Sequence, residues 1–138
     1  MNPMVIKPTK DSIDLGIVTR DLAPMVAFYR DTLGFTDLGE SESIVGTMHR
    51  LVCGTSHIKL VRPGTPPPAE ASPGGVGAAT GYRYWTISVP DLADVLRACE
   101  AAGRPVVLPP TVARPGVTVA MVEDPDGNWV EFLQADAS

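Results

Sequence analysis

The feature that most constrains the fold of this chain is a repeat on either side of a segment rich in proline and glycine. Residues 62–81 read RPGTPPPAEASPGGVGAATG, a composition typical of a linker rather than of helix or strand. Before it, IDLGIVTRDLAPMVAFYRDTLGF passes from a strand pattern to a helical pattern, and after it YRYWTISVPDLADVLRACEAAGR does the same. An offset of 70 carries Asp21 onto Asp91, which indicates two copies of one structural unit.

Each copy predicts a βαβββ module. Asp21 and Asp91 are suited to cap the helices, which end near Gly34 and Gly103. The later strands are expected at 35–40, 44–53 and 57–62 in the first copy and at 104–108, 117–123 and 128–134 in the second. We therefore expect an α+β fold of curved mixed sheets around a cleft, with the helices on the outer face. The predicted organisation is one domain over 1–138, with a first module at 12–62, a linker at 63–81 and a second module at 82–135.

The last hairpin contains one carboxylate in an apolar run. The turn at 124–127, DPDG, is explained by its conformation alone, so we assign no catalytic role to Asp124 or Asp126. Glu131 follows in NWVEFL, and a carboxylate is rarely buried unless it is paired or bound to a metal. An offset of 72 carries SHIKLV at 56–61 onto this strand, with Lys59 at the position of Glu131.

Strand alternation predicts which residues share the face away from the helices. On that face we expect a mixture of polar and aromatic side chains, namely Asp14, His57, Lys59, Tyr84, Trp129 and Glu131. If the two sheets curve together, these faces line one cavity with apolar walls and a few convergent polar groups, as small-molecule sites do. The alternative is a solvated face, which antiparallel sheets allow. The face of His49 is not fixed by the sequence.

Composition excludes some partners. The net charge of −5, with scattered basic residues, argues against nucleic acid, and no run is long enough for a signal peptide or a transmembrane helix. Cys53 and Cys99 lack metal-site or C-x-x-C spacing and are expected as reduced thiols. We therefore expect a cytoplasmic protein with no membrane partner.

Two phrases together carry a family resemblance. F-Y-R-D-x-L-G-F (Phe28 to Phe35) and D-P-D-G-N-x-x-E (Asp124 to Glu131) resemble the vicinal oxygen chelate superfamily, which groups glyoxalase, bleomycin-resistance and extradiol-dioxygenase proteins. The resemblance implies paired βαβββ modules around a cleft, commonly in a homodimer. It also implies that enzymes of this kind hold a divalent metal in the cleft through His and Glu side chains.

The resemblance places the four ligand positions on Asp14, Lys59, Tyr84 and Glu131. Only Glu131 matches the expected chemistry, since His is expected at 14 and 84 and His or Glu at 59. We therefore expect a protein that binds a small oxygen-rich metabolite, with a degenerate metal site and no cofactor. The alternative is a glyoxalase-type lyase or isomerase with Mn, Fe, Ni or Zn held by Glu131, Asp14 and a histidine. A dioxygenase is disfavoured because it needs redox-active iron and intact ligands.

Several residue roles remain open at this point. Lys59 is expected to form a buried ion pair with Asp14 and Glu131, to bind a substrate anion, or to extend into solvent. In an enzyme, the proton donors and acceptors would be Glu131, Tyr84 and Lys59. The further ligand-binding candidates are Asp14, His49, His57, Arg83 and Trp129, with Arg83 as an anion binder at the cleft edge.

Overall fold

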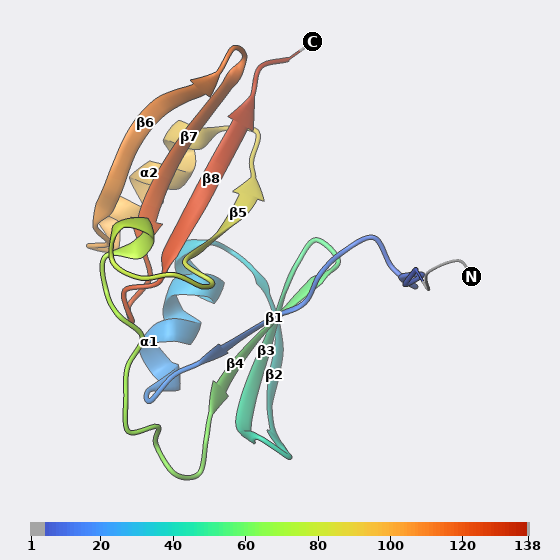
Figure 1. The fold of residues 1–138 in the computed structure, drawn as a ribbon. Coiled ribbons are helices and arrows are strands. Elements are labelled where there is room, and N and C mark those ends of the chain that lie inside the picture. Colours follow the sequence, from blue (N-terminus) through green and yellow to red (C-terminus); the bar gives the residue numbers. More distant parts are fainter. Residues whose placement is uncertain (1–4, 138) are drawn as a thin grey trace.

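The computed structural model describes residues 5–137, which form two βαβββ modules (Figure 1). The first module comprises β1 (Leu15–Val18), α1 (Leu22–Val26) with a π-helical continuation (Ala27–Thr32), β2 (Thr36–Ser43), β3 (Gly46–Cys53) and β4 (Ser56–Arg62). The second comprises β5 (Tyr84–Ser88), α2 (Leu92–Ala101), β6 (Val106–Arg114), β7 (Val117–Glu123) and β8 (Trp129–Ala135). The predicted α+β repeat is confirmed.

Each module builds one four-stranded mixed sheet. Sheet A has the strand order β1-β4-β3-β2 and sheet B the order β5-β8-β7-β6. In each sheet the first strand runs parallel to the last, and the other neighbours are antiparallel. The strands β1 and β5 are therefore edges, and they lie where the two modules meet (Figure 1).

The helices begin where their capping residues predict. Ala23 N donates to Asp21 Oδ1 at 3.3 Å, and Asp94 N donates to Asp91 Oδ1 at 3.1 Å. Strand β6 is longer than the predicted 104–108, because its prolines at 109–110 lie on the outer strand of sheet B, where a missing N–H costs no ladder bond on the free side.

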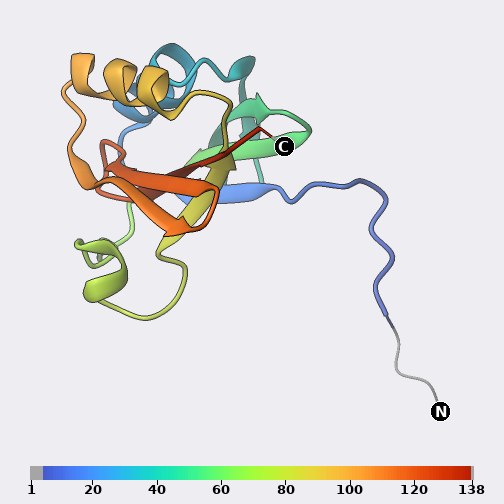
Figure 2. The ribbon, with the colours of Figure 1, turned by 90° about the horizontal axis from the view of Figure 1, so that it is seen from above.

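Both helices lie on the same side of the molecule and share one hydrophobic core (Figure 2). The most deeply buried side chains come from both modules, among them Met25, Tyr29, Leu60, Cys99 and Phe132. Cys53 is half-buried, Cys99 is buried, and both are free thiols. No helix in the described part of the chain has the length and apolarity needed to cross a bilayer.

One buried polar contact joins the modules. The Tyr29 hydroxyl donates to Asp124 Oδ2 at 2.7 Å, and both residues are at most 1% exposed. Asp124 Oδ1 also accepts from the backbone N–H groups of Asp126 at 2.9 Å and Asn128 at 3.0 Å. The aspartate therefore fixes the DPDG turn and anchors it to the helical segment of the first module.

Candidate functional site

Each sheet has a face turned away from the helices, which we call its open face. On sheet A the register places Gly16 and Arg50 on either side of Lys59, and Val52 opposite His57. These residues share the open face, since directly paired residues lie on the same side of a sheet. The neighbouring Ile58 points to the core.

The open face of sheet B has apolar residues of β7 in its middle, with Glu131 beside them, and a charged residue at each end, since Glu123 pairs with Trp129 and Arg114 pairs with Val117. Glu131 pairs with Thr86 on β5 and with Met121 on β7, while Trp129 pairs with Tyr84. The Thr86 hydroxyl donates to the Glu131 carboxylate at 2.7 Å. The surrounding floor is formed by buried apolar residues of β7, namely Val117, Val119 and Met121.

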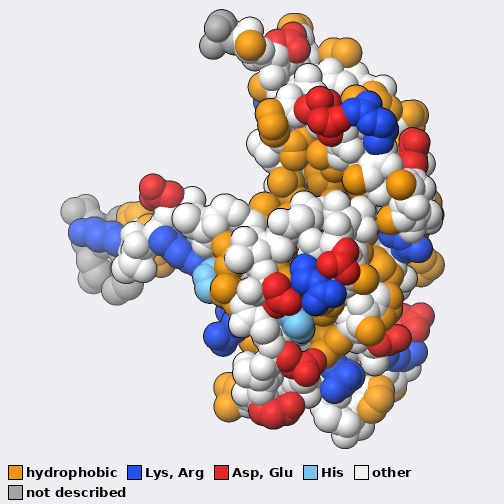
Figure 3. All heavy atoms as spheres, turned by 180° about the vertical axis from the view of Figure 1, so that it is seen from behind, with side chains coloured by type: hydrophobic (Ala, Val, Ile, Leu, Met, Phe, Trp, Pro, Cys, Tyr) orange, Lys and Arg blue, Asp and Glu red, His pale blue; other side chains and the backbone are white. Residues whose placement is uncertain are grey.

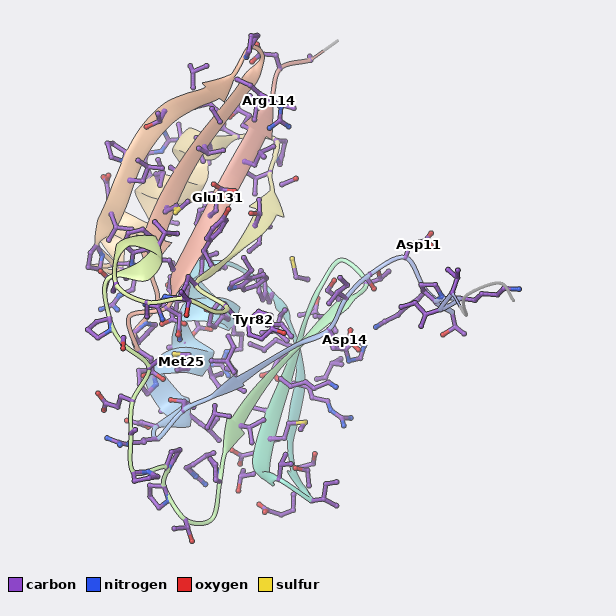
Figure 4. All side chains as sticks on the ribbon, viewed as in Figure 1. Asp11, Asp14, Met25, Tyr82, Arg114 and Glu131 are labelled. Carbon is purple, nitrogen blue, oxygen red and sulfur yellow. The ribbon has the colours of Figure 1, made fainter. Side chains whose placement is uncertain are left out.

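Within one chain the four positions divide between these faces. Asp14 and Lys59 belong to the first module, and Tyr84 and Glu131 to the second; Figure 4 shows Asp14 and Glu131 well apart. Lys59 forms no ion pair among residues 5–137. The expected ion pair of Lys59 with Asp14 and Glu131 is therefore wrong for a single chain.

Asp14 instead accepts hydrogen bonds from residues that precede the linker. Its Oδ1 accepts from Lys10 Nζ at 2.6 Å and from the backbone N–H of His57 at 2.8 Å. These two bonds, the one from Lys10 first, lower the pKa of Asp14 from 3.8 to about 2. Asp14 thus ties the entry of β1 to the start of β4, a local role that accounts for its charge.

The described residues of one chain do not fit a divalent metal. Across residues 5–137, no three His, Cys, Asp or Glu side chains lie close enough to hold an ion. His49 lies on the core side of sheet A, because it pairs with Leu60, and its Nε2 is 2.7 Å from Asp37 Oδ1. Within residues 5–137 of one chain, His49, Glu131 and Asp14 therefore do not come together, and a metal held by Glu131, Asp14 and a histidine stays a prediction. His57 lies on the open face beside Lys59, but Lys59 is itself a cation.

The linker closes one end of the open face of sheet B (Figures 1 and 2). Arg83 Nε donates to Gly75 O at 2.8 Å, and its Nη2 donates to Ser72 O. A Cβ on Gly75 would collide with the Trp129 ring, so the backbone lies directly against the indole. Arg83, expected as an anion binder, is thus held by linker carbonyls, and Trp129 Nε1 is buried without a hydrogen-bond partner among the described residues.

Sequence reasoning did not assign Thr86, Arg50 or Gly75 to the site. Thr86 could have been found, since an offset of 70 makes it the counterpart of Gly16 and strand alternation places it with Tyr84. Arg50 required the register of β3 against β4. Gly75 lies in a segment whose composition indicates only the absence of regular structure.

Comparisons with known proteins agree with this architecture. Residues 12–132 match the family model of the Glyoxalase/Bleomycin resistance protein/Dioxygenase superfamily. No curated protein matches the chain. Among solved structures, a glyoxalase family protein from Bacillus cereus is similar at 17% identity and a TM-score of 0.82, covering 98% of this chain and 100% of the other.

Two further structures are similar in fold. A glyoxylase/bleomycin resistance protein/dioxygenase domain from Frankia sp. EAN1pec has 16% identity and a TM-score of 0.74, with 96% of each chain covered. The antibiotic binding protein TnmS3 from Streptomyces sp. CB03234 has 20% identity and a TM-score of 0.69, covering 94% of this chain and 100% of that one. At these identities the likeness concerns the fold alone. The family model, in contrast, spans most of the sequence, and the chain therefore belongs to the Glyoxalase/Bleomycin resistance protein/Dioxygenase superfamily.

Proposed function

We propose that this chain binds a small oxygen-rich molecule in a cleft that a second copy completes. In this arrangement the open face of sheet A from one copy covers the open face of sheet B from the other. The cleft then brings together Asp14 and Lys59 of one copy with Tyr84 and Glu131 of the second. Two such clefts form in a symmetric dimer.

The observation that carries this proposal is the composition of the open face of sheet B. Its floor is apolar, the Thr86–Glu131 hydrogen bond supplies polar groups, and the linker closes one end. Apart from the linker, no described segment lies in front of this face (Figures 1 and 2). Small-molecule sites combine apolar walls with a few polar groups in this way, but they enclose most of the ligand. A second wall is therefore needed.

The edge strands at the junction of the modules, β1 and β5, support a second copy as that wall. Both β1 and β5 end their sheets, so their outer backbone groups have no strand partner within the described residues. Open edges pair readily with another chain. Seen from the side of the helices, the surface is also hollowed between the modules, near the N-terminal segment, and hydrophobic side chains gather there (Figure 3). The similarity in fold to an antibiotic binding protein is consistent with a binding role.

A fluorescence titration with an uncharged probe, N-phenyl-1-naphthylamine, tests the proposal when it is combined with sedimentation equilibrium. We expect a dimer that binds about one probe molecule per chain, and loss of binding with Thr86→Trp, which fills the space before Glu131. Val112→Trp is the matched control, because Val112 is 69% exposed and pairs with Thr118 on the other face of sheet B. A monomer that binds the probe equally well, or a dimer that binds none, contradicts the proposal.

Metal analysis separates binding from the catalytic alternative. With Lys59 at a ligand position and Asp14 held by Lys10, we expect no stoichiometric Mn, Fe, Ni or Zn in the purified dimer. Stoichiometric metal that is lost in Glu131→Gln would instead favour a glyoxalase-type lyase or isomerase, with ligands drawn from both copies.

A further inference from the structure

We infer that the ligand of this cleft is an amphipathic organic anion, whose charged group binds Arg50 and Lys59 and whose apolar body lies on sheet B. This inference rests on the proposed function, because it assigns the two walls of the proposed cleft to the two parts of one ligand.

The first support is a pair of cations directly opposite one another. Arg50 on β3 and Lys59 on β4 are paired residues, so their side chains share the open face of sheet A. His57 lies two residues before Lys59 on the same face. Like charges directly opposite in a sheet are destabilising, and an anion between them removes the repulsion.

The second support is that the protein supplies no anion of its own to this pair. Among residues 5–137, neither Arg50 nor Lys59 forms an ion pair, whereas Arg20, Arg30 and Arg97 each do. Arg50 Nε donates to the sulfur of Met48 at 3.4 Å, and in the described part of the chain neither terminal nitrogen of the guanidinium has a hydrogen-bond partner. That geometry suits a carboxylate or another flat oxyanion.

The open face of sheet A differs in charge from the rest of the molecule. The chain carries a net charge of −5, whereas Arg50 and Lys59 form a local positive group. Such a group attracts anions to this position. In the proposed cleft, Glu131 of the second copy would neutralise one cation of the two. Glu131 also already accepts from Thr86, and the remaining positive charge is left for the ligand.

The opposite wall defines the other end of the ligand. Val117, Val119 and Met121 form the floor of sheet B, and Trp129 flanks it. Such a surface binds an aromatic or aliphatic body rather than a sugar or an inorganic ion. The two walls together therefore select a molecule with one acidic group and one apolar part.

Two fluorescent probes of similar shape test this inference in the full-length dimer. The anion 8-anilinonaphthalene-1-sulfonate carries a sulfonate that N-phenyl-1-naphthylamine lacks. We expect the anion to bind more tightly, and Arg50→Gln or Lys59→Gln to weaken it about tenfold each, as loss of a charged hydrogen bond does. Binding of the uncharged probe should remain within about twofold. Arg62→Gln is the control, because Arg62 is exposed on β4 but pairs with Thr47 on the other face.

The outcomes separate this inference from the proposed function. If both probes bind equally and the variants change neither affinity, the inference of an anionic ligand fails, while the proposed binding cleft is retained. If neither probe binds, the proposed function fails. If Arg50→Gln and Lys59→Gln dissociate the dimer but leave the affinity for the anion unchanged, the two cations pair with carboxylates of the second copy, and the inference is overturned.

Discussion

Removing the Tyr29 hydroxyl should destabilise the protein by about 2 kcal/mol. The Tyr29→Phe change deletes the donor to Asp124 Oδ2 at 2.7 Å but keeps the ring, which packs against Phe35 and Trp85. A hydrogen bond to a charged group contributes about 1.5–3 kcal/mol. The lower part of this range applies, because Asn128 Nδ2 still donates to the same oxygen at 3.0 Å.

The assay is urea denaturation followed by circular dichroism at one fixed protein concentration, since dissociation of a dimer would make stability depend on concentration. For a chain of this length, the expected loss corresponds to roughly 6–8 °C in melting temperature. Tyr82→Phe is the matched control, because its side chain is fully exposed, and its effect should stay within about 0.5 kcal/mol. A loss below about 0.5 kcal/mol in Tyr29→Phe would refute the assignment of this bond as the tie between modules.

The same pair predicts a dependence on alkaline pH. Burial, and then the charge of Asp124, raise the pKa of the Tyr29 hydroxyl well above its usual 10.0. The unfolded chain loses this proton near pH 10 while the folded chain retains it, so the stabilisation is complete below pH 10 and declines above it. The stability difference between the wild type and Tyr29→Phe should therefore shrink between about pH 9 and pH 11. A constant difference would contradict the buried, protonated hydroxyl.

Two further predictions concern Asp14 and the linker. The Asp14 carboxyl should titrate near pH 2 by NMR, and Lys10→Met should raise that value toward 3.8; a wild-type value near 3.8 would show that the bond to Lys10 does not persist in solution. Since its folded pKa is depressed, the stabilisation from Asp14 is present above pH 3.8 and is lost as the pH falls toward about 2. Gly75→Ala should detach the linker from Trp129 and increase proteolysis of the linker, because the new Cβ collides with the indole and the φ of Gly75 is +58°. Gly77→Ala is the control and should be cleaved like the wild type, because a Cβ on Gly77 has no atom within 4 Å. Equal proteolysis of both variants would contradict the packing.

The repeat of two βαβββ modules was predictable because short sequence patterns determine each of its elements. The N-caps at Asp21 and Asp91, the turn at 124–127 and the alternating strands each follow from short-range chemistry, and they lie where they were expected, except that β2 and β6 extend beyond their predicted ends. The partner of Asp124 was not predictable in this way, because Tyr29 is distant in sequence and reaches the turn only through packing of the two modules.

The site was predicted less completely, for a related reason. Strand alternation placed Lys59 and Glu131 on the faces away from the helices, but it does not say whether the two faces of one chain meet. The two faces of one chain do not meet. Asp14 instead accepts a hydrogen bond from Lys10, and Arg83 donates to carbonyl groups of the linker. The side of sheet A on which His49 lies also depended on register, which the sequence left open.

The central claim is that each cleft is built from two copies, and mixing two blocked variants tests it most directly. Gly16 and Thr86 are equivalent positions on the open faces of sheets A and B, and tryptophan at either enters open or exposed space within the chain. Dimers of Gly16→Trp alone, or of Thr86→Trp alone, should bind no N-phenyl-1-naphthylamine. After subunit exchange in an equal mixture, half of the dimers are mixed and each contains one unaltered cleft, so about a quarter of the wild-type sites should return. A mixture that recovers no sites would contradict the account, because it would place both faces of the cleft within one chain.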